Sequence, residues 1–158
     1  MTGPRVDELA SALSAAFAAD LAARPMTTLR SGDARDSYCK DIPFDADIDV
    51  PTDEYLERFS FGVSHLDAAS WRHYLPVLGT YALKCRNQGS NVIDALIQSL
   101  RPPDRDPPRL ASLSPAQEDA IRQLLEVLAF AGDSAFQSDA CQALEEWWVE
   151  NPLYRPAK

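Results

Sequence analysis

The chain has 158 residues, of which 46% are hydrophobic and 25% charged, so its composition is that of a folded domain and not of a disordered segment. Its formal net charge of −9 argues against binding to nucleic acid or to an anionic membrane, because both draw their affinity from cationic side chains. We therefore expect one domain, residues 1–158, that binds neither and whose charge suits a basic protein partner.

The cysteines indicate the cellular compartment. Cys39, Cys85 and Cys141 are odd in number and far apart, and no CxxC motif is present, which is untypical of a secreted disulfide framework. The apolar run at residues 10–19 follows two acidic residues, which a secretory leader would lack. These features predict reduced thiols in a cytoplasmic protein.

The first expected helix spans residues 4–23, with Pro4 at its first position and Arg24-Pro25 at its end. One apolar stripe with helical spacing supports it, formed by Val6, Leu9, Leu13, Phe17 and Leu21. Residues 25–51 lack periodicity and are expected to form a long acidic surface loop. A short strand in that loop and an extended stretch at residues 61–66 would give a small β element within residues 26–66.

Residues 52–152 are expected to form a helical core. Thr52 and Asp67 are predicted N-caps of two successive helices. Pro76 falls inside the second pattern, where it either kinks one helix or lies near the start of another. Asn91 is the predicted cap of a heavily buried helix that ends before the proline-rich connector at residues 101–109.

Two more helices complete the pattern. Ser114, with Pro115 and Gln117 after it, predicts a capping box, and Gly132 is the expected residue after the helix end. A last helix is expected from Ser134 or Ser138 to Glu150. Its adjacent tryptophans, Trp147 and Trp148, point about 100° apart on a helix, so one is expected in the core. The other is expected either at an edge or exposed, or packed under the N-terminal helix or the C-terminal tail. The predicted fold is mainly α, an irregular bundle of about six helices.

The most distinctive feature of the sequence is acidic. Residues 33–57 carry nine acidic residues against two basic ones, a net charge of −7 that accounts for most of the chain's charge. Such a segment is either a solvated loop or a docking surface for a basic partner. The residues expected to contact that partner are Asp36, Asp41, Asp45, Asp47, Asp49 and Glu54.

The motifs of catalysis and metal binding are weak. The run from Asp45 to Asp49 resembles the start of a calcium loop, but Val50 and Leu56 occupy the positions of its glycine and glutamate. His65 and His73 are too far apart for a close pair of zinc ligands. No nucleophile elbow, P-loop or dinucleotide fingerprint is present. We assign no catalytic, cofactor-binding or metal-ligating residue and expect no cofactor.

The stretches LDAASWRHYLPVLGTYAL (residues 66–83) and LSPAQEDAIRQLLEVL (residues 113–128) carry a resemblance. A capped Tyr-Leu-Pro helix followed by a Leu-Ser-Pro-x-Gln helix resembles a family of small bacterial helical proteins of unknown function, over residues 52–150. The resemblance implies a bacterial, cytosolic, helical domain, and it transfers no site.

Three functional hypotheses follow. The first is a non-catalytic protein-interaction module, in its most concrete form an immunity-like or antitoxin-like inhibitor that holds a basic partner on its acidic surface. The second is a small enzyme with a carboxylate and divalent-metal site. The third is a structural assembly subunit that uses an exposed Trp147 or Trp148 in a contact between copies.

Overall fold

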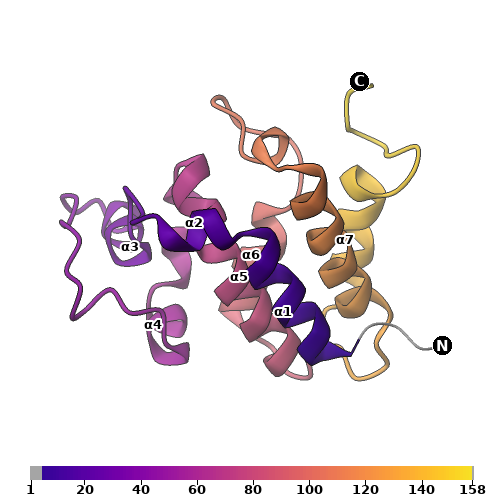
Figure 1. Ribbon diagram of the computed structural model, residues 1–158, viewed down its shortest axis with the longest axis horizontal. Helices are drawn as coiled ribbons and strands as arrows, with labels where there is room; N and C mark the ends of the chain where they lie inside the picture. The colour runs from indigo at the N-terminus through magenta and orange to yellow at the C-terminus, as the bar shows by residue number, and fades with distance from the viewer. Residues whose placement is uncertain (1–4, 158) are drawn as a thin grey trace.

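The computed structural model describes residues 5–157 and is built from helices (Figure 1). The mainly α prediction is confirmed. The β element expected within residues 26–66 is wrong, since residues 5–157 contain no strand. In place of the six helices expected, this part of the chain forms eight α-helices and three short 3₁₀ or π segments. The number rises because the first expected helix is divided in two and the acidic loop contains a helix of its own.

The N-terminal region forms α1 (Val6–Ala16) and α2 (Ala18–Ala22). They are separated at Phe17, whose backbone angles of −108° and 19° are not helical and whose ring is fully buried. The apolar stripe therefore reaches the core through Leu9, Leu13 and Phe17, whereas α2 buries none of its own residues. The role predicted for Pro4 lies outside the described residues.

Helix α3 (Leu29–Asp36) lies inside the segment expected to be a loop. Thr28 caps it by accepting a hydrogen bond from the Ser31 amide at 2.9 Å. This helix packs on the 3₁₀ segment η1 (Ser60–His65), where an extended stretch was expected. The two backbones approach closely at Gly32 and Gly62, where a side chain would not fit. A methyl group added to Gly62 would lie 2.1 Å from the Leu29 carbonyl oxygen.

The next helices are α4 (Asp53–Arg58), capped by Thr52 as predicted, and α5 (Ala68–Cys85), capped by Asp67 as predicted. Helix α5 is continuous through Pro76, so one helix and not two occupies this stretch. It lies at the centre of the molecule, in contact with α1, α2, α6 (Asn91–Ser99) and α7 (Pro115–Phe130). Its buried Trp71, Tyr74, Leu75 and Leu78 anchor the core.

Two of the predicted helix ends differ in detail. The cap of α6 is Ser90 and not Asn91, since the Ser90 hydroxyl accepts from the Val92 and Ile93 amides at 3.2 and 3.3 Å. Helix α7 begins with the predicted capping box of Ser114 and Gln117, but it ends at an extended Ala131. Gly132 does not adopt the left-handed conformation expected of a glycine at a helix end.

The last helix is α8 (Gln137–Ala143), which continues into a π-helical turn, Leu144–Trp148. There the Val149 amide donates to the Leu144 carbonyl five residues earlier, at 3.1 Å. The turn and its surroundings bury both tryptophans, each only 6% exposed, so of the two alternatives the packed one holds and the exposed one does not. Arg155 of the C-terminal tail lies over Trp147, with its guanidinium carbon 5.1 Å from the ring centre. An assembly contact that needs an exposed Trp147 or Trp148 is incompatible with this arrangement.

The two tryptophans differ in one hydrogen bond, which gives a matched pair of variants. The Trp148 indole Nε1 donates to the Leu100 carbonyl at 2.8 Å, whereas the equally buried Trp147 Nε1 has no partner. We expect Trp148→Phe to lower the free energy of unfolding by about 1–2 kcal/mol more than Trp147→Phe, because only the first leaves a buried carbonyl without its donor. Urea denaturation of both variants measures the difference, and equal losses would contradict the assignment.

Figure 1 shows the placement of the parts that matter for function. Helices α3 and α4 and the chain between them lie at one end of the long axis, and α7 and the C-terminal segment lie at the other. The acidic stretch is thus concentrated at one end of the molecule. None of the helices in residues 5–157 is both long enough and apolar enough to cross a membrane.

Candidate binding surfaces

Asp49 organises the acidic segment from its interior. Its side chain is 0% exposed, and Arg30 of α3 binds both carboxylate oxygens, with nitrogen–oxygen distances of 3.0 Å from Nε and 2.9 Å from Nη2. The Tyr55 hydroxyl of α4 donates to the same carboxylate at 2.6 Å, and the Asp45 amide donates at 2.8 Å. One buried carboxylate therefore ties the loop to α3 and to α4.

The protonation of this cluster follows from its contacts. Burial alone would raise the pKa of Asp49, but the hydrogen bonds from Arg30, Tyr55 and the Asp45 amide outweigh it and hold the pKa below its ordinary value. Burial, and then the hydrogen bond to Asp49, raise the pKa of Tyr55. The carboxylate is therefore ionised and the phenol neutral at neutral pH. Asp49, one of the predicted contact residues, is a structural ion-pair partner here, and its carboxylate does not reach the surface.

Two other predicted contact residues are exposed but already paired. Arg35 binds Asp41 through two nitrogen–oxygen contacts of 2.6 and 2.8 Å, and this hydrogen bonding lowers the pKa of Asp41. Asp36, at the end of α3, accepts a contact of 3.0 Å from the His65 ring nitrogen Nε2. The acidic residues therefore do not act as one repelling cluster, because neighbouring basic groups bind several of them.

The remaining predicted residues, Asp45, Asp47 and Glu54, are exposed and have no cationic partner among residues 5–157. Asp47 and Glu54 border a shallow groove of about 510 Å³ between the loop and α4. Its apolar lining includes Ile48 and Val50, which are 50% and 48% exposed. We call this feature the Asp47–Glu54 groove. Arg58 is a basic residue at the same groove, with its guanidinium 5.2 Å from the centre of the Phe59 ring.

The histidines lie apart. His65 contacts Asp36, whereas the Nδ1 atom of His73 lies 2.9 Å from the Asp20 carbonyl oxygen. Cys39, Cys85 and Cys141 are free thiols. In the part of the chain that the structure describes, no three His, Cys, Asp or Glu side chains lie close enough together to hold a metal ion.

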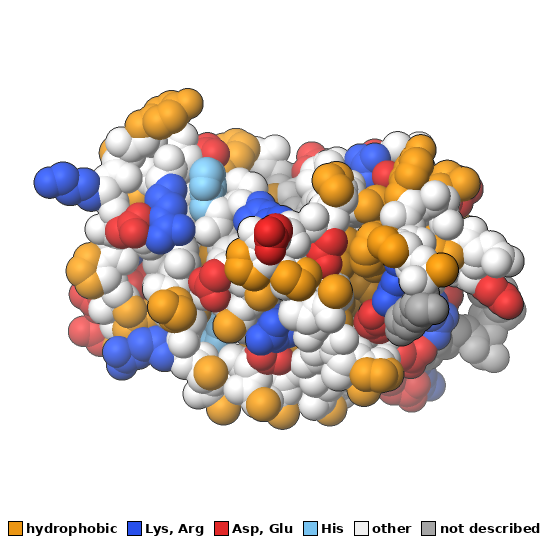
Figure 2. Space-filling view, turned by 90° about the horizontal axis from the view of Figure 1, so that it is seen from above, with side chains coloured by type: hydrophobic (Ala, Val, Ile, Leu, Met, Phe, Trp, Pro, Cys, Tyr) orange, Lys and Arg blue, Asp and Glu red, His pale blue; other side chains and the backbone are white. Residues whose placement is uncertain are grey.

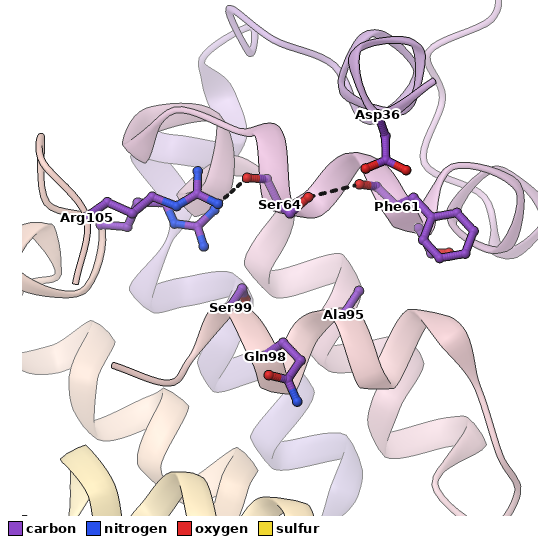
Figure 3. A pocket seen from close by; sticks show the side chains of 9 residues that line it. Asp36, Phe61, Ser64, Ala95, Gln98, Ser99 and Arg105 are labelled. Atoms are coloured by element: carbon purple, nitrogen blue, oxygen red, sulfur yellow. Dashed lines mark hydrogen bonds between the residues drawn. The ribbon is translucent and has the colours of Figure 1, made fainter. Parts of the chain in front are cut away.

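A second site lies where the sequence analysis found only a stiff connector. Arg105 and Arg109, from residues 101–109, reach back under η1 and line a pocket of about 200 Å³ between η1 and α6 (Figure 3). Arg109 is 6% exposed and donates through Nη1 to the Val63 carbonyl at 3.1 Å. Arg105 donates to the carbonyls of Ser64 and Leu66. The sequence shows two arginines among prolines and gives no signal of their burial, which depends on η1 some 45 residues earlier.

The surface seen in Figure 2 is mixed in character. Acidic side chains lie beside Lys or Arg side chains across this face, including the end that holds α3, and hydrophobic side chains are dispersed among them. On this face the acidic side chains therefore do not form one continuous acidic surface. Local features, such as the Asp47–Glu54 groove, decide what the surface can bind.

These features describe an all-helical domain with an acid-bordered groove at one end and an arginine-lined pocket beside α6. The sequence matches a family of unknown function, DUF6714, over residues 5–152, so the chain belongs to this family. No curated protein and no solved structure matches the chain.

Proposed function

We propose that the protein is a non-catalytic interaction module that binds a basic segment of a partner protein in the Asp47–Glu54 groove. The observation that supports this most is the combination of two unpaired carboxylates with exposed apolar side chains on one surface. Carboxylates at the border of a site attract Lys or Arg, and Ile48 and Val50 offer apolar area for the neighbouring side chains of the same segment. The occupant is therefore an amphipathic basic segment.

The buried cluster supports the proposal by fixing the groove's shape. Asp49, Arg30 and Tyr55 hold the loop that carries Asp47 against the helix that carries Glu54. A groove that is ordered before binding loses less conformational entropy when the partner docks. Such a surface suits a tight inhibitor, so an immunity-like or antitoxin-like protein of the bacterial cytoplasm is the form of module we propose.

The role of the unpaired carboxylates is testable with a double variant, Asp47→Asn/Glu54→Gln. Wild-type protein and variant would each be used to capture proteins from the native cell, with elution by rising salt and identification by mass spectrometry. We expect the wild-type protein to capture a basic partner. The affinity of that purified partner for the variant should be about 10-fold lower than for wild type, since two surface ion pairs are worth roughly 0.7 kcal/mol each. Added salt should reduce this difference.

A matched control keeps the change in net charge constant. Glu145 and Glu150 are exposed and have no ion pair among the described residues, and they lie in the C-terminal region away from the groove. The variant Glu145→Gln/Glu150→Gln should therefore bind the partner like wild type. The proposal would be overturned if both double variants lost the same affinity for the partner. It would also be overturned if no captured protein bound wild type more tightly than the groove variant.

A further inference from the structure

Arg109 carries a buried positive charge that contacts no carboxylate among residues 5–157. Arg109 makes none of the ion pairs found in residues 5–157, and its recorded partners are the Val63 carbonyl and the Trp71 ring, whose centre lies 5.3 Å from the guanidinium carbon. Burial, and then the charge of Arg105, lower the pKa of Arg109 to about 10. A buried guanidinium without an ion-pair partner lowers the stability of the fold, because its lost hydration is not replaced.

Asp104, one residue before Arg105 and five before Arg109, is bound by backbone amides. Asp104 accepts hydrogen bonds of 2.8 Å from four backbone amides, those of Arg105, Arg109, Leu110 and Ala111. It thereby shapes the turn that presents both arginines, and it forms an ion pair with neither. Arg105 likewise donates only to backbone carbonyls. Two guanidinium groups thus converge on one pocket without a neutralising contact.

Other polar side chains line the same pocket. Ser60, which is 2% exposed, is one of them. Gln98 is exposed, and its side-chain oxygen accepts from Arg101 Nη1 at 3.4 Å, so its amide group is turned with the oxygen toward Arg101. Figure 3 shows Arg105 at the opposite side of the pocket from Asp36, which lies beside Phe61 and binds His65. Arg105 is therefore separated by the pocket from the acid that lines it.

From this arrangement we infer that the pocket between η1 and α6 binds a small oxyanion, the phosphate or carboxylate group of a metabolite. Guanidinium groups bind both through paired, charge-assisted hydrogen bonds. A volume of about 200 Å³, next to a second hollow of about 210 Å³ that shares Gln98, Ser99, Arg105 and Arg109, admits a compact ligand. Phe61 and Ala95 supply its apolar wall, and Asp36 faces the end of the ligand away from the anion.

The inference is independent of the proposed protein partner, because the two sites share no residue. Its test uses the full chain and two probes, inorganic phosphate and acetate, added at constant ionic strength with chloride as the reference. The side-chain Nε–H signals of arginine in two-dimensional NMR spectra report binding at the guanidinium groups. We expect the Arg105 and Arg109 signals to shift with a dissociation constant near or below about 1 mM. The tighter of the two probes identifies the ligand group as phosphate or carboxylate.

Variants locate the effect. Arg105→Gln should weaken binding at least 10-fold while the fold is retained, because Arg105 lies at the surface and the buried Arg109 stays in place. Asp36→Asn should leave binding intact or strengthen it, since it removes the acid that lines the pocket. Arg24→Gln, which removes an exposed arginine elsewhere, is the charge-matched control. Unchanged arginine signals with both probes, or equal weakening by Arg105→Gln and Arg24→Gln, would overturn the inference.

Discussion

Replacement of Asp49 by alanine is expected to lower the free energy of unfolding by about 3 kcal/mol, because it leaves the largely buried guanidinium of Arg30 without its counter-charge. The Arg30 side chain is 15% exposed and cannot regain full hydration at its present position. The variant also removes the acceptor of the Tyr55 hydroxyl and of the Asp45 amide. Urea denaturation, with the slope compared to wild type, measures the loss.

Asp41→Ala is the matched control, since it breaks an ion pair of the same two-nitrogen geometry on the same helix. The Asp41 side chain is 63% exposed, so water replaces its contacts, and the expected loss is much smaller than that for Asp49→Ala. Similar losses for the two variants would contradict a structural role for Asp49.

Acid pH gives a second control for Asp49. Its pKa in the fold lies below the ordinary 3.8, so its contribution to stability is complete above about pH 5. That contribution is lost as the pH falls through 3.8 towards the folded-state value. The stability difference between wild type and Asp49→Asn should therefore be constant near neutral pH and shrink in acid, and a difference independent of pH down to the acid transition would contradict the ion pair.

Gly62→Ala is expected to destabilise the protein by at least about 3 kcal/mol, at the upper end of the cost of overpacking. The added methyl group would lie 2.1 Å from the Leu29 carbonyl oxygen and 2.9 Å from the Asp33 amide nitrogen. Both atoms belong to the backbone of α3, so relief requires that the helix move away from η1. Thermal and urea unfolding of the variant measure the effect.

The control for this prediction is Gly89→Ala. Gly89 has nothing within 4 Å of the position of an added methyl group, and its backbone does not adopt a positive φ. We expect a change within about 1 kcal/mol of wild type, on the stabilising side if the loop tolerates it. If Gly62→Ala behaved like Gly89→Ala, the close contact of α3 with η1 would be wrong.

The sequence predicts those parts of the fold that depend on neighbouring residues. Thr52, Asp67 and Ser114 each cap a helix as expected, because a side-chain acceptor two or three residues before free amides is a local signal. Helix α3 was missed because its segment, LRSGDARD, has one large apolar residue, Leu29. The close packing of Gly32 in α3 against Gly62 in η1 holds the helix in place. Such a contact leaves no hydrophobic periodicity in the sequence.

The candidate sites likewise combine features that local sequence shows with features that depend on distant residues. The concentration of acids was visible in the sequence, but which of them are free was not, because the partner of Asp49 is Arg30, 19 residues earlier. The arginine pocket was hidden for a similar reason. Arg105 and Arg109 bond carbonyls of residues 63–66, and a connector rich in proline gives no sign that its charges turn inward.

The measurement that tests the proposed function most directly is hydrogen–deuterium exchange of the protein alone and in complex with the partner it captures. The proposal predicts that amides of residues 44–59 exchange more slowly in the complex, since they form and support the Asp47–Glu54 groove. Slowed exchange confined to residues 98–112, or to the C-terminal residues 149–157, with residues 44–59 unchanged, would place the partner elsewhere and contradict the proposed function.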